Sequence, residues 1–89
     1  MVTKKQAERI FNQIEKKYRH NGWFDQPELI KDWKFIGWSD GQAVEYPTVD
    51  YAIVWEGGPD YWVDQALLID DPDVYVEPYT SWALAIHEK

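Results

Sequence analysis

Sheet formation is predicted most directly by KFIGWSDGQAVEYPTVDYAIVW, residues 34–55. Segments 35–38 and 43–46 are rich in aromatic and apolar side chains, and an Asp-Gly pair at 40–41 lies between them. Asp-Gly between two such segments is a strong signal for a β-hairpin with a tight turn. Pro47 has no amide N–H to donate, so we expect the second strand to end early or to lie at a sheet edge.

The rest of this stretch predicts a central strand. Side chains alternate from Val49 to Glu56, and the middle of the segment is apolar on both faces. A strand that is apolar on both faces is expected inside a sheet rather than at its edge. Farther along the chain, 74–76 and 82–86 predict two more strands, joined across 78–81 as a closing hairpin.

The beginning of the chain predicts an amphipathic helix over 4–20. Thr3 and Gln6 have the spacing of an N-terminal capping box. Asn21-Gly22 supplies residues that accept the left-handed conformation in which helices end. Apolar side chains recur at the spacing of one helical stripe, while charged side chains cover the other faces. The stripe consists of Ala7, Ile10, Phe11, Ile14 and Tyr18.

Two shorter helices are considered farther along the chain. Asp25 and Glu28 repeat the capping-box spacing around Pro27, and the apolar side chains that follow predict a helix of about 26–33. Residues 60–69 fit either a short helix or a returning strand. Their apolar spacing favours the helix, and both interpretations stay open.

Together these elements predict an α+β fold in a single domain, residues 1–89. A long N-terminal amphipathic helix is expected to pack on a small, mostly antiparallel sheet of three to five strands, with one or two short helices. A chain of 89 residues is too short to divide into two cores. Fifteen aromatic side chains can supply a core without metal or disulfide support, and the sequence contains no Cys.

Charge is distributed unevenly along the chain. Residues 1–20 carry six basic and two acidic side chains, so this segment has a charge of +4, whereas residues 21–89 carry −11; the net charge is −7. Binding to nucleic acid requires clustered basic charge, so direct nucleic-acid binding is not expected. An acidic surface suits solubility or docking onto a basic protein surface.

Several function classes lack their sequence signals. The chain contains no glycine-rich phosphate loop, no H-E-x-x-H and no G-x-S-x-G, so we expect no cofactor and no metal. The start of the chain is charged and helical rather than apolar, and no apolar run approaches the roughly 20 residues that cross a bilayer. We therefore expect a cytoplasmic protein that does not associate with membranes.

Two aromatic, acidic turns are the candidates for a binding surface. In the first, Glu56, Asp60 and Tyr61 surround a Gly-Gly-Pro sequence between two Trp residues. The second contains Glu77 and Tyr79 beside Pro78 and Trp82. If the two turns lie at one end of the sheet, these carboxylates and rings share a surface that can clasp a cationic group, a sugar or a partner's Arg. The alternative is that the Trp residues are core anchors and the carboxylates are solvated.

The same two segments carry a family resemblance. Residues 55–62 have the form W-E-x-G-P-x-x-W, and residues 77–84 have the form E-P-x-x-x-W-A-L. Together they resemble small uncharacterised proteins of actinobacteria and their phages. The resemblance covers the second half of the chain and carries no activity with it. It implies a phage or mobile-element protein that acts in a host cytoplasm.

Three functional hypotheses follow from these observations. The first is a non-enzymatic interaction module that binds another protein through Glu56, Asp60, Tyr61, Glu77 and Tyr79. The second is a small carbohydrate- or ligand-binding domain in which Trp62 and Trp82, with Tyr61, are stacking platforms. The third is a hydrolase that uses Glu56 and Glu77 as acid and base, which the small size of the domain disfavours. An exposed edge strand can also pair two copies of the chain into a homodimer.

The histidines and one aspartate cluster were considered as metal ligands. His20 and His87 each lack a second His at ligand spacing, so surface or helix-end positions are expected. Asp70, Asp71 and Asp73 lack the order of an EF-hand loop, so we expect a solvated turn.

Overall fold

The computed structural model describes residues 1–18, 27–55, 66–80 and 82–89. Their elements, in chain order, are helix α1 (Lys4–Tyr18) and strands β1 (Glu28–Trp33), β2 (Ile36–Ser39), β3 (Gln42–Glu45), β4 (Val49–Val54), β5 (Val74–Thr80) and β6 (Ala83–Glu88). The strands form two sheets, a four-stranded sheet in the order β1-β4-β6-β5 and a two-stranded sheet of β2 and β3. Every pair of neighbouring strands is antiparallel.

The predicted fold class is wrong. A long helix on a single sheet of three to five strands was expected, whereas the described residues form six strands in two separate sheets and only one helix, of 15 residues. Strand residues therefore outnumber helical residues in this part of the chain. The difference has two sources: a segment predicted as helix is a strand, and the predicted hairpin stands apart as a sheet of its own.

The helix predicted over 26–33 does not form. Residues 28–33 are β1, which pairs with β4 along its length, from Glu28 opposite Val54 to Trp33 opposite Val49. A helix of two turns has little stability of its own, because nucleation costs more than so few hydrogen bonds return. Pairing with β4 satisfies the same backbone groups and buries apolar side chains as well. The capping-box spacing was a local signal that long-range pairing overrides.

Helix α1 begins as predicted. The Thr3 hydroxyl accepts a hydrogen bond from the Gln6 amide, 3.2 Å, and the Gln6 side chain accepts one from the Thr3 amide, 3.0 Å, which confirms the capping box. Ala7, Ile10 and Ile14 are fully buried in the same apolar cluster as residues of β4, β5 and β6. The helix ends at Tyr18, and the predicted end at residue 20 lies outside the described residues.

The central strand and the closing hairpin are both present. Strand β4 lies between β1 and β6, and Ala52 and Ile53, which alternate across the sheet, are fully buried. Strands β5 and β6 pair as the expected hairpin, with a register irregularity between Pro78 and Thr80. The turn predicted over 78–81 starts too early, because both of these residues lie within β5. Pro78 is tolerated there because β5 is an edge strand.

In the described end of segment 60–69, Ala66 is helical and Leu67 and Leu68 form a turn. The Ile69 amide donates to the Ala66 carbonyl oxygen over 3.1 Å, and no described strand includes 66–69. Residues 60–65, on which the choice between helix and strand depended, lie outside the described residues.

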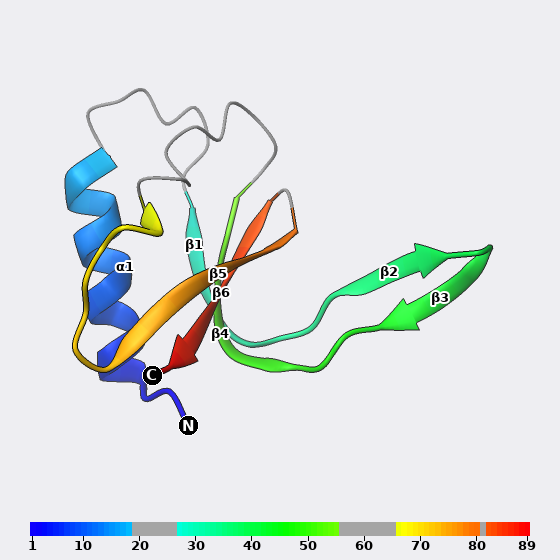
Figure 1. Ribbon diagram of the computed structural model, residues 1–89, viewed down its shortest axis with the longest axis horizontal. Coiled ribbons are helices and arrows are strands. Elements are labelled where there is room, and N and C mark those ends of the chain that lie inside the picture. The colour runs from blue at the N-terminus through cyan, green and yellow to red at the C-terminus, as the bar shows by residue number, and fades with distance from the viewer. Residues whose placement is uncertain (19–26, 56–65, 81) are drawn as a thin grey trace.

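Strands β2 and β3 form an arm that projects from the body (Figure 1). We call residues 34–47 the β-arm. Its turn is the predicted Asp-Gly pair, with positive φ at Asp40 (52°) and Gly41 (76°). Positive φ at both central residues is the geometry of the type I′ turn, whose twist matches that of a hairpin. The prediction that the strand before Pro47 ends early is confirmed, since β3 ends at Glu45.

The β-arm continues the β1–β4 pair with a shifted register. Trp33 lies opposite Val49 in the body, whereas Ile36 lies opposite Glu45 in the arm. Between these two pairs the chain advances three residues from Trp33 to Ile36, but four residues from Glu45 to Val49. The additional residue lies in the segment that contains Pro47, which cannot donate to the ladder. The register shift marks the junction at which the arm leaves the plane of the body sheet.

A buried ion pair ties α1 to the segment that leads into β5. Asp71 is fully buried and accepts two hydrogen bonds from Arg9, both 2.8 Å, through Nε and Nη2. Its Oδ1 also accepts from the backbone amides of Asp73 and Val74 at 2.9 and 3.2 Å. The Asp70–Asp73 segment was predicted as a solvated turn, and for Asp71 that prediction is wrong. A buried carboxylate requires such partners, because an unpaired one costs several kcal/mol.

Replacing Asp71 should test how much this pair contributes to stability. Asp71→Asn keeps the volume but removes the charge that Arg9 binds, and we expect a loss of about 2 kcal/mol in the free energy of unfolding. Asp70→Asn is the matched control, because Asp70 is exposed and its ion pair with Lys89 lies at the surface, so its loss should stay below about 1 kcal/mol. Urea unfolding of both variants measures the difference. Equal losses would show that the buried pair is not a stabilising contact.

The ion pair also predicts acid sensitivity. Hydrogen bonds from Arg9 and from two backbone amides hold the pKa of the Asp71 carboxyl well below its usual value of 3.8. The unfolded chain therefore binds a proton at higher pH than the folded chain, so this contribution is complete above about pH 5 and declines as the pH falls through 3.8. Between pH 5 and 3, unfolding free energy should fall more steeply in wild type than in Asp71→Asn. Parallel curves would contradict this prediction.

Candidate interaction surface on the β-arm

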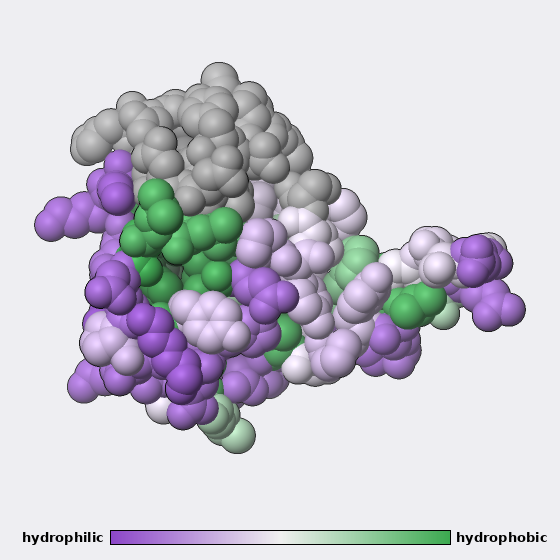
Figure 2. All heavy atoms as spheres, in the orientation of Figure 1, coloured by the Kyte–Doolittle hydropathy of each residue, from purple (hydrophilic) through white to green (hydrophobic). Residues whose placement is uncertain are grey.

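One face of the β-arm exposes large apolar side chains. Trp38 is 78% exposed and Ile36 is 53% exposed, and both lie on β2 two residues apart, so they share a face. Figure 2 shows a small group of apolar atoms on the projecting arm. We call Ile36 and Trp38, together with Ala43 and Glu45 opposite them, the arm face.

The strand register explains why this face stays open. Trp38 lies directly opposite Ala43, and Ile36 lies opposite Glu45. The Ala43 methyl group is too small to cover an indole, and Glu45 extends to Lys34, with 3.1 Å between Nζ and Oε2. Exposed single apolar residues are ordinary on protein surfaces. Two on one face of a thin projection are not, because nothing in the arm itself can bury them.

Five aromatic rings, which we call the aromatic base, join the other side of the arm to the body. Phe35 is central, with centroid distances of 5.2 Å to Tyr46, 5.7 Å to Trp82 and 6.1 Å to Trp33. Tyr79 completes the group, 5.9 Å from Trp33 and 6.0 Å from Tyr46. Most of these contacts are tilted or edge-to-face, which is a favourable arrangement for aromatic pairs. The aromatic base therefore anchors the arm.

Two details of the backbone place these rings. Asp32 has a φ of 52° within β1, a conformation that Asp tolerates better than most residues. Beyond it, Trp33 packs on the cluster of Val49, Ala52 and Ala85, whereas Leu29 packs on the helix-side cluster. From β5, the Tyr79 hydroxyl donates to the Pro47 carbonyl oxygen over 3.2 Å. Both ends of the arm are thus held against the same side of the body sheet.

The body sheet carries a polar pair near the aromatic base. His87 Nε2 lies 3.2 Å from a Glu77 carboxylate oxygen, and the Tyr75 ring is 5.4 Å from the imidazole. Glu77 is exposed and His87 is partly buried. Glu77 lies opposite Ala85 in the ladder, and Tyr79 packs against the cluster that contains Ala85, so both lie on the same side of the sheet. The acidic group predicted at this site is therefore a neighbour of the aromatic base.

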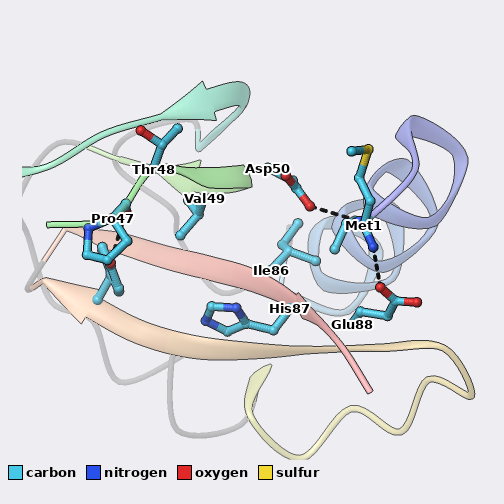
Figure 3. Close-up of a pocket in the computed structure, with 10 residues that line it drawn as sticks. Met1, Pro47, Thr48, Val49, Asp50, Ile86, His87 and Glu88 are labelled. Carbon is cyan, nitrogen blue, oxygen red and sulfur yellow. Dashed lines mark hydrogen bonds and ion pairs between the residues drawn. The ribbon is translucent and has the colours of Figure 1, made fainter.

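A shallow pocket of about 320 Å³ lies between the start of the chain, β4 and β6 (Figure 3). Both of its carboxylates are occupied by the start of the chain: Asp50 accepts from the Val2 amide, 2.9 Å, and Glu88 binds the Met1 ammonium. The lining side chains include His87 and Tyr79. The two carboxylates of this pocket thus hold the start of the chain against β4 and β6.

The structure describes only some of the predicted site residues. Glu77 and Tyr79 lie on β5, and Trp82, 41% exposed, follows it and packs its ring on Phe35. Tyr79 and Trp82 both belong to the aromatic base. The other predicted residues, Glu56, Asp60, Tyr61 and Trp62, lie outside the described residues. The joint surface of the two turns and the Glu56–Glu77 pair therefore remain predictions.

Sequence reasoning missed the arm face. Ile36 and Trp38 were assigned to a hairpin, and a hairpin strand gives no sign of whether its apolar side chains are covered. One signal was present in the sequence: Trp38 lies only two positions before Asp40, where the turn begins. A large ring that close to a hairpin tip has few neighbours to cover it.

Comparisons and searches for other sites add two facts. No protein-family model, curated protein or solved structure matches the chain. Within the described ranges, no group of three or more His, Asp or Glu side chains could hold a metal ion, and no helix is long and apolar enough to cross a membrane.

A substitution at Gly37 tests how tightly the aromatic base is packed. A Cβ at this position would lie 3.1 Å from Phe35 and 3.2 Å from Tyr46, both of which are held by further rings. We expect Gly37→Ala to destabilise the protein by about 1 kcal/mol and to weaken its near-ultraviolet circular dichroism, which reports fixed aromatic packing. Ser39→Ala, two residues nearer the tip, is the control and should change neither. A stabilised Gly37→Ala protein would show that the rings can move apart.

Proposed function

We propose that this protein is a non-enzymatic interaction module that binds another protein through the arm face. One observation carries the proposal: a projecting two-stranded sheet, paired only with itself among the described strands, presents Trp38 with 78% of its surface exposed. A two-stranded ribbon is marginally stable alone in water. Five aromatic rings nevertheless pack where the ribbon joins the body and hold it in its projecting position.

The composition of the arm face supports binding to a protein. Trp is the residue most enriched among the side chains that dominate binding energies, and such residues are typically central and surrounded by polar groups. Here Trp38 and Ile36 are bordered by Asp40, Glu45 and Lys34. Because the aromatic base anchors the arm before binding, less conformational entropy is lost when a partner docks.

The charge of the chain indicates the kind of partner. The net charge is −7, and Asp40 and Glu77 are exposed acidic groups on the arm and beside its base. A partner with an apolar pocket and a basic rim would be steered towards this side of the molecule. Glu56, Asp60 and Tyr61 remain proposed contacts in the same surface, with Glu77 and Tyr79. We propose that the protein acts in a host cytoplasm, as the resemblance to phage proteins implies.

Trp38→Ala tests the proposal directly. In affinity capture from an actinobacterial lysate followed by mass spectrometry, we expect wild type to retain a specific protein and Trp38→Ala to bind it at least about 30-fold more weakly. Leu68→Ala is the matched control, because Leu68 is also 78% exposed but lies on the body. The control should bind like wild type.

Two outcomes would contradict the proposed function. One is equal retention by wild type, Trp38→Ala and Leu68→Ala, which would mean that the arm face takes no part in binding. The other is the absence of any specific partner at both low and moderate salt.

A further inference from the structure

The chain has four sheet edges among its described strands, and they differ in how they are protected. Natural sheets prevent unwanted pairing by placing charged residues or Pro on edge strands. Strand β1 carries Glu28, Lys31 and Asp32, and β5 carries Glu77 and Pro78. Strand β3 carries Glu45 and is followed by Pro47. Strand β2, Ile36–Ser39, contains neither a charge nor a Pro.

The hydrogen-bond pattern shows which backbone groups face outward from β2. The Tyr46 amide donates to the Phe35 carbonyl oxygen over 3.0 Å, so Phe35 and Tyr46 are a hydrogen-bonded pair. Such pairs alternate along an antiparallel ladder. Ile36 and Trp38 are therefore in non-hydrogen-bonded positions, and their N–H and C=O groups point away from β3. The free edge of the arm thus presents donors and acceptors from its two most exposed apolar residues.

We propose that this edge pairs with β2 of a second copy of the chain, antiparallel and with Gly37 opposite Gly37 on a two-fold axis. The inference rests on the proposed function of the β-arm as an interaction element and names one of its partners. Two arms joined in this way form one continuous ribbon in the order β3-β2-β2-β3. The pairing is isologous, because the same edge contributes from both copies.

The sequence of the arm is complementary to itself in this register. Antiparallel pairing about Gly37 places Ile36 beside the partner's Trp38, and Trp38 beside the partner's Ile36. It also places Asp40 opposite the partner's Lys34. Neighbouring apolar pairs and opposite charges across strands are both stabilising. A register centred on Ile36 or on Trp38 would instead leave Asp40 without the partner's Lys34 opposite it.

The shape of the molecule allows two acidic copies to approach. In antiparallel pairing the two bodies lie at opposite ends of the ribbon, and the longest dimension of one copy, 39 Å, runs towards the arm tip (Figure 1). Charges separated by more than about 8–10 Å are largely screened at physiological salt. Within the arm, the charge of Glu45 is already balanced by Lys34. The paired ribbon would carry both copies of Ile36 and Trp38 on one face, which doubles the arm face.

The amides of the arm provide a direct test in wild type. The segment is short, so a weak dimer is expected, and hydrogen exchange by NMR should be measured up to about 1 mM protein. The amides of Ile36 and Trp38 should become at least about tenfold more protected as concentration rises, because only they gain acceptors. The amides of Ala43 and Glu45, which face outward from β3, are the internal control and should not change. Protection of Ala43 and Glu45 instead would overturn the proposal.

Analytical ultracentrifugation of proline variants provides the second test. Ile36→Pro removes an outward-facing donor without breaking a hydrogen bond of the arm, and Ala43→Pro does the same on β3. Wild type and Ala43→Pro should approach twice the chain mass of 10.6 kDa with similar dissociation constants, and Ile36→Pro should dimerise at least about tenfold more weakly. Asp40→Asn, which keeps the turn geometry, should also weaken the dimer.

The outcomes separate this inference from the proposed function. A wild-type protein that stays monomeric at all concentrations, while Trp38→Ala still loses its captured partner, would overturn the dimer and leave the proposed function standing. A wild-type dimer with the predicted exchange pattern, combined with unchanged capture by Trp38→Ala, would support the dimer and overturn binding of another protein through the arm face.

Discussion

The antiparallel pairing of β1 with β4 is the contact on which the rest of the structure depends. It turns a segment with helical signals into a strand, and it places β4 between β1 and β6 in the body sheet. It also brings Trp33 next to Val49, so the chain between them must leave the body and return at one point. The β-arm is the consequence, because residues 34–48 are long enough for a hairpin and begin and end side by side.

The two sides of the arm are used differently, and Gly37 explains how. On one side, the missing Cβ at Gly37 lets Phe35 and Tyr46 close over the strand and meet the rings of the body. On the other, Ile36 and Trp38 have only Ala43 and Glu45 opposite them. The aromatic base therefore supplies the stability that a two-stranded ribbon lacks, and the arm face is left for contacts outside the chain. Rigid attachment and open apolar surface together are what a preorganised binding element requires.

The body is held together by different forces from the arm. Its core is aliphatic, and α1 contributes Ile10 and Ile14 to the same cluster as Ile53 and Leu84. Asp71 adds a directional constraint, because Arg9 and two backbone amides fix the position at which the chain enters β5. Since β5 carries Tyr79, this ion pair helps to position the strand that supports the arm.

The sequence by itself determined the features whose signals and contacts are local. The capping box of Thr3 and Gln6 starts α1, and Asp40-Gly41 makes the turn of the arm, because each depends on residues within a few positions of one another. The pattern of residues 49–54 also identified the central strand, since a strand that is buried on both faces carries apolar side chains on both faces.

Only the tertiary structure decided where the remaining parts lie. Residues 28–33 form a strand because their partner lies some twenty positions later in the chain, and no local pattern reports a long-range ladder. The aromatic base unites Trp33, Phe35 and Tyr46 with Tyr79 and Trp82, which are far apart in sequence. Trp38 looked like any apolar residue of a hairpin. Its exposure follows from what the fold leaves uncovered, and coverage is a property of the assembled chain, because the sequence of a strand does not state which neighbours it will have.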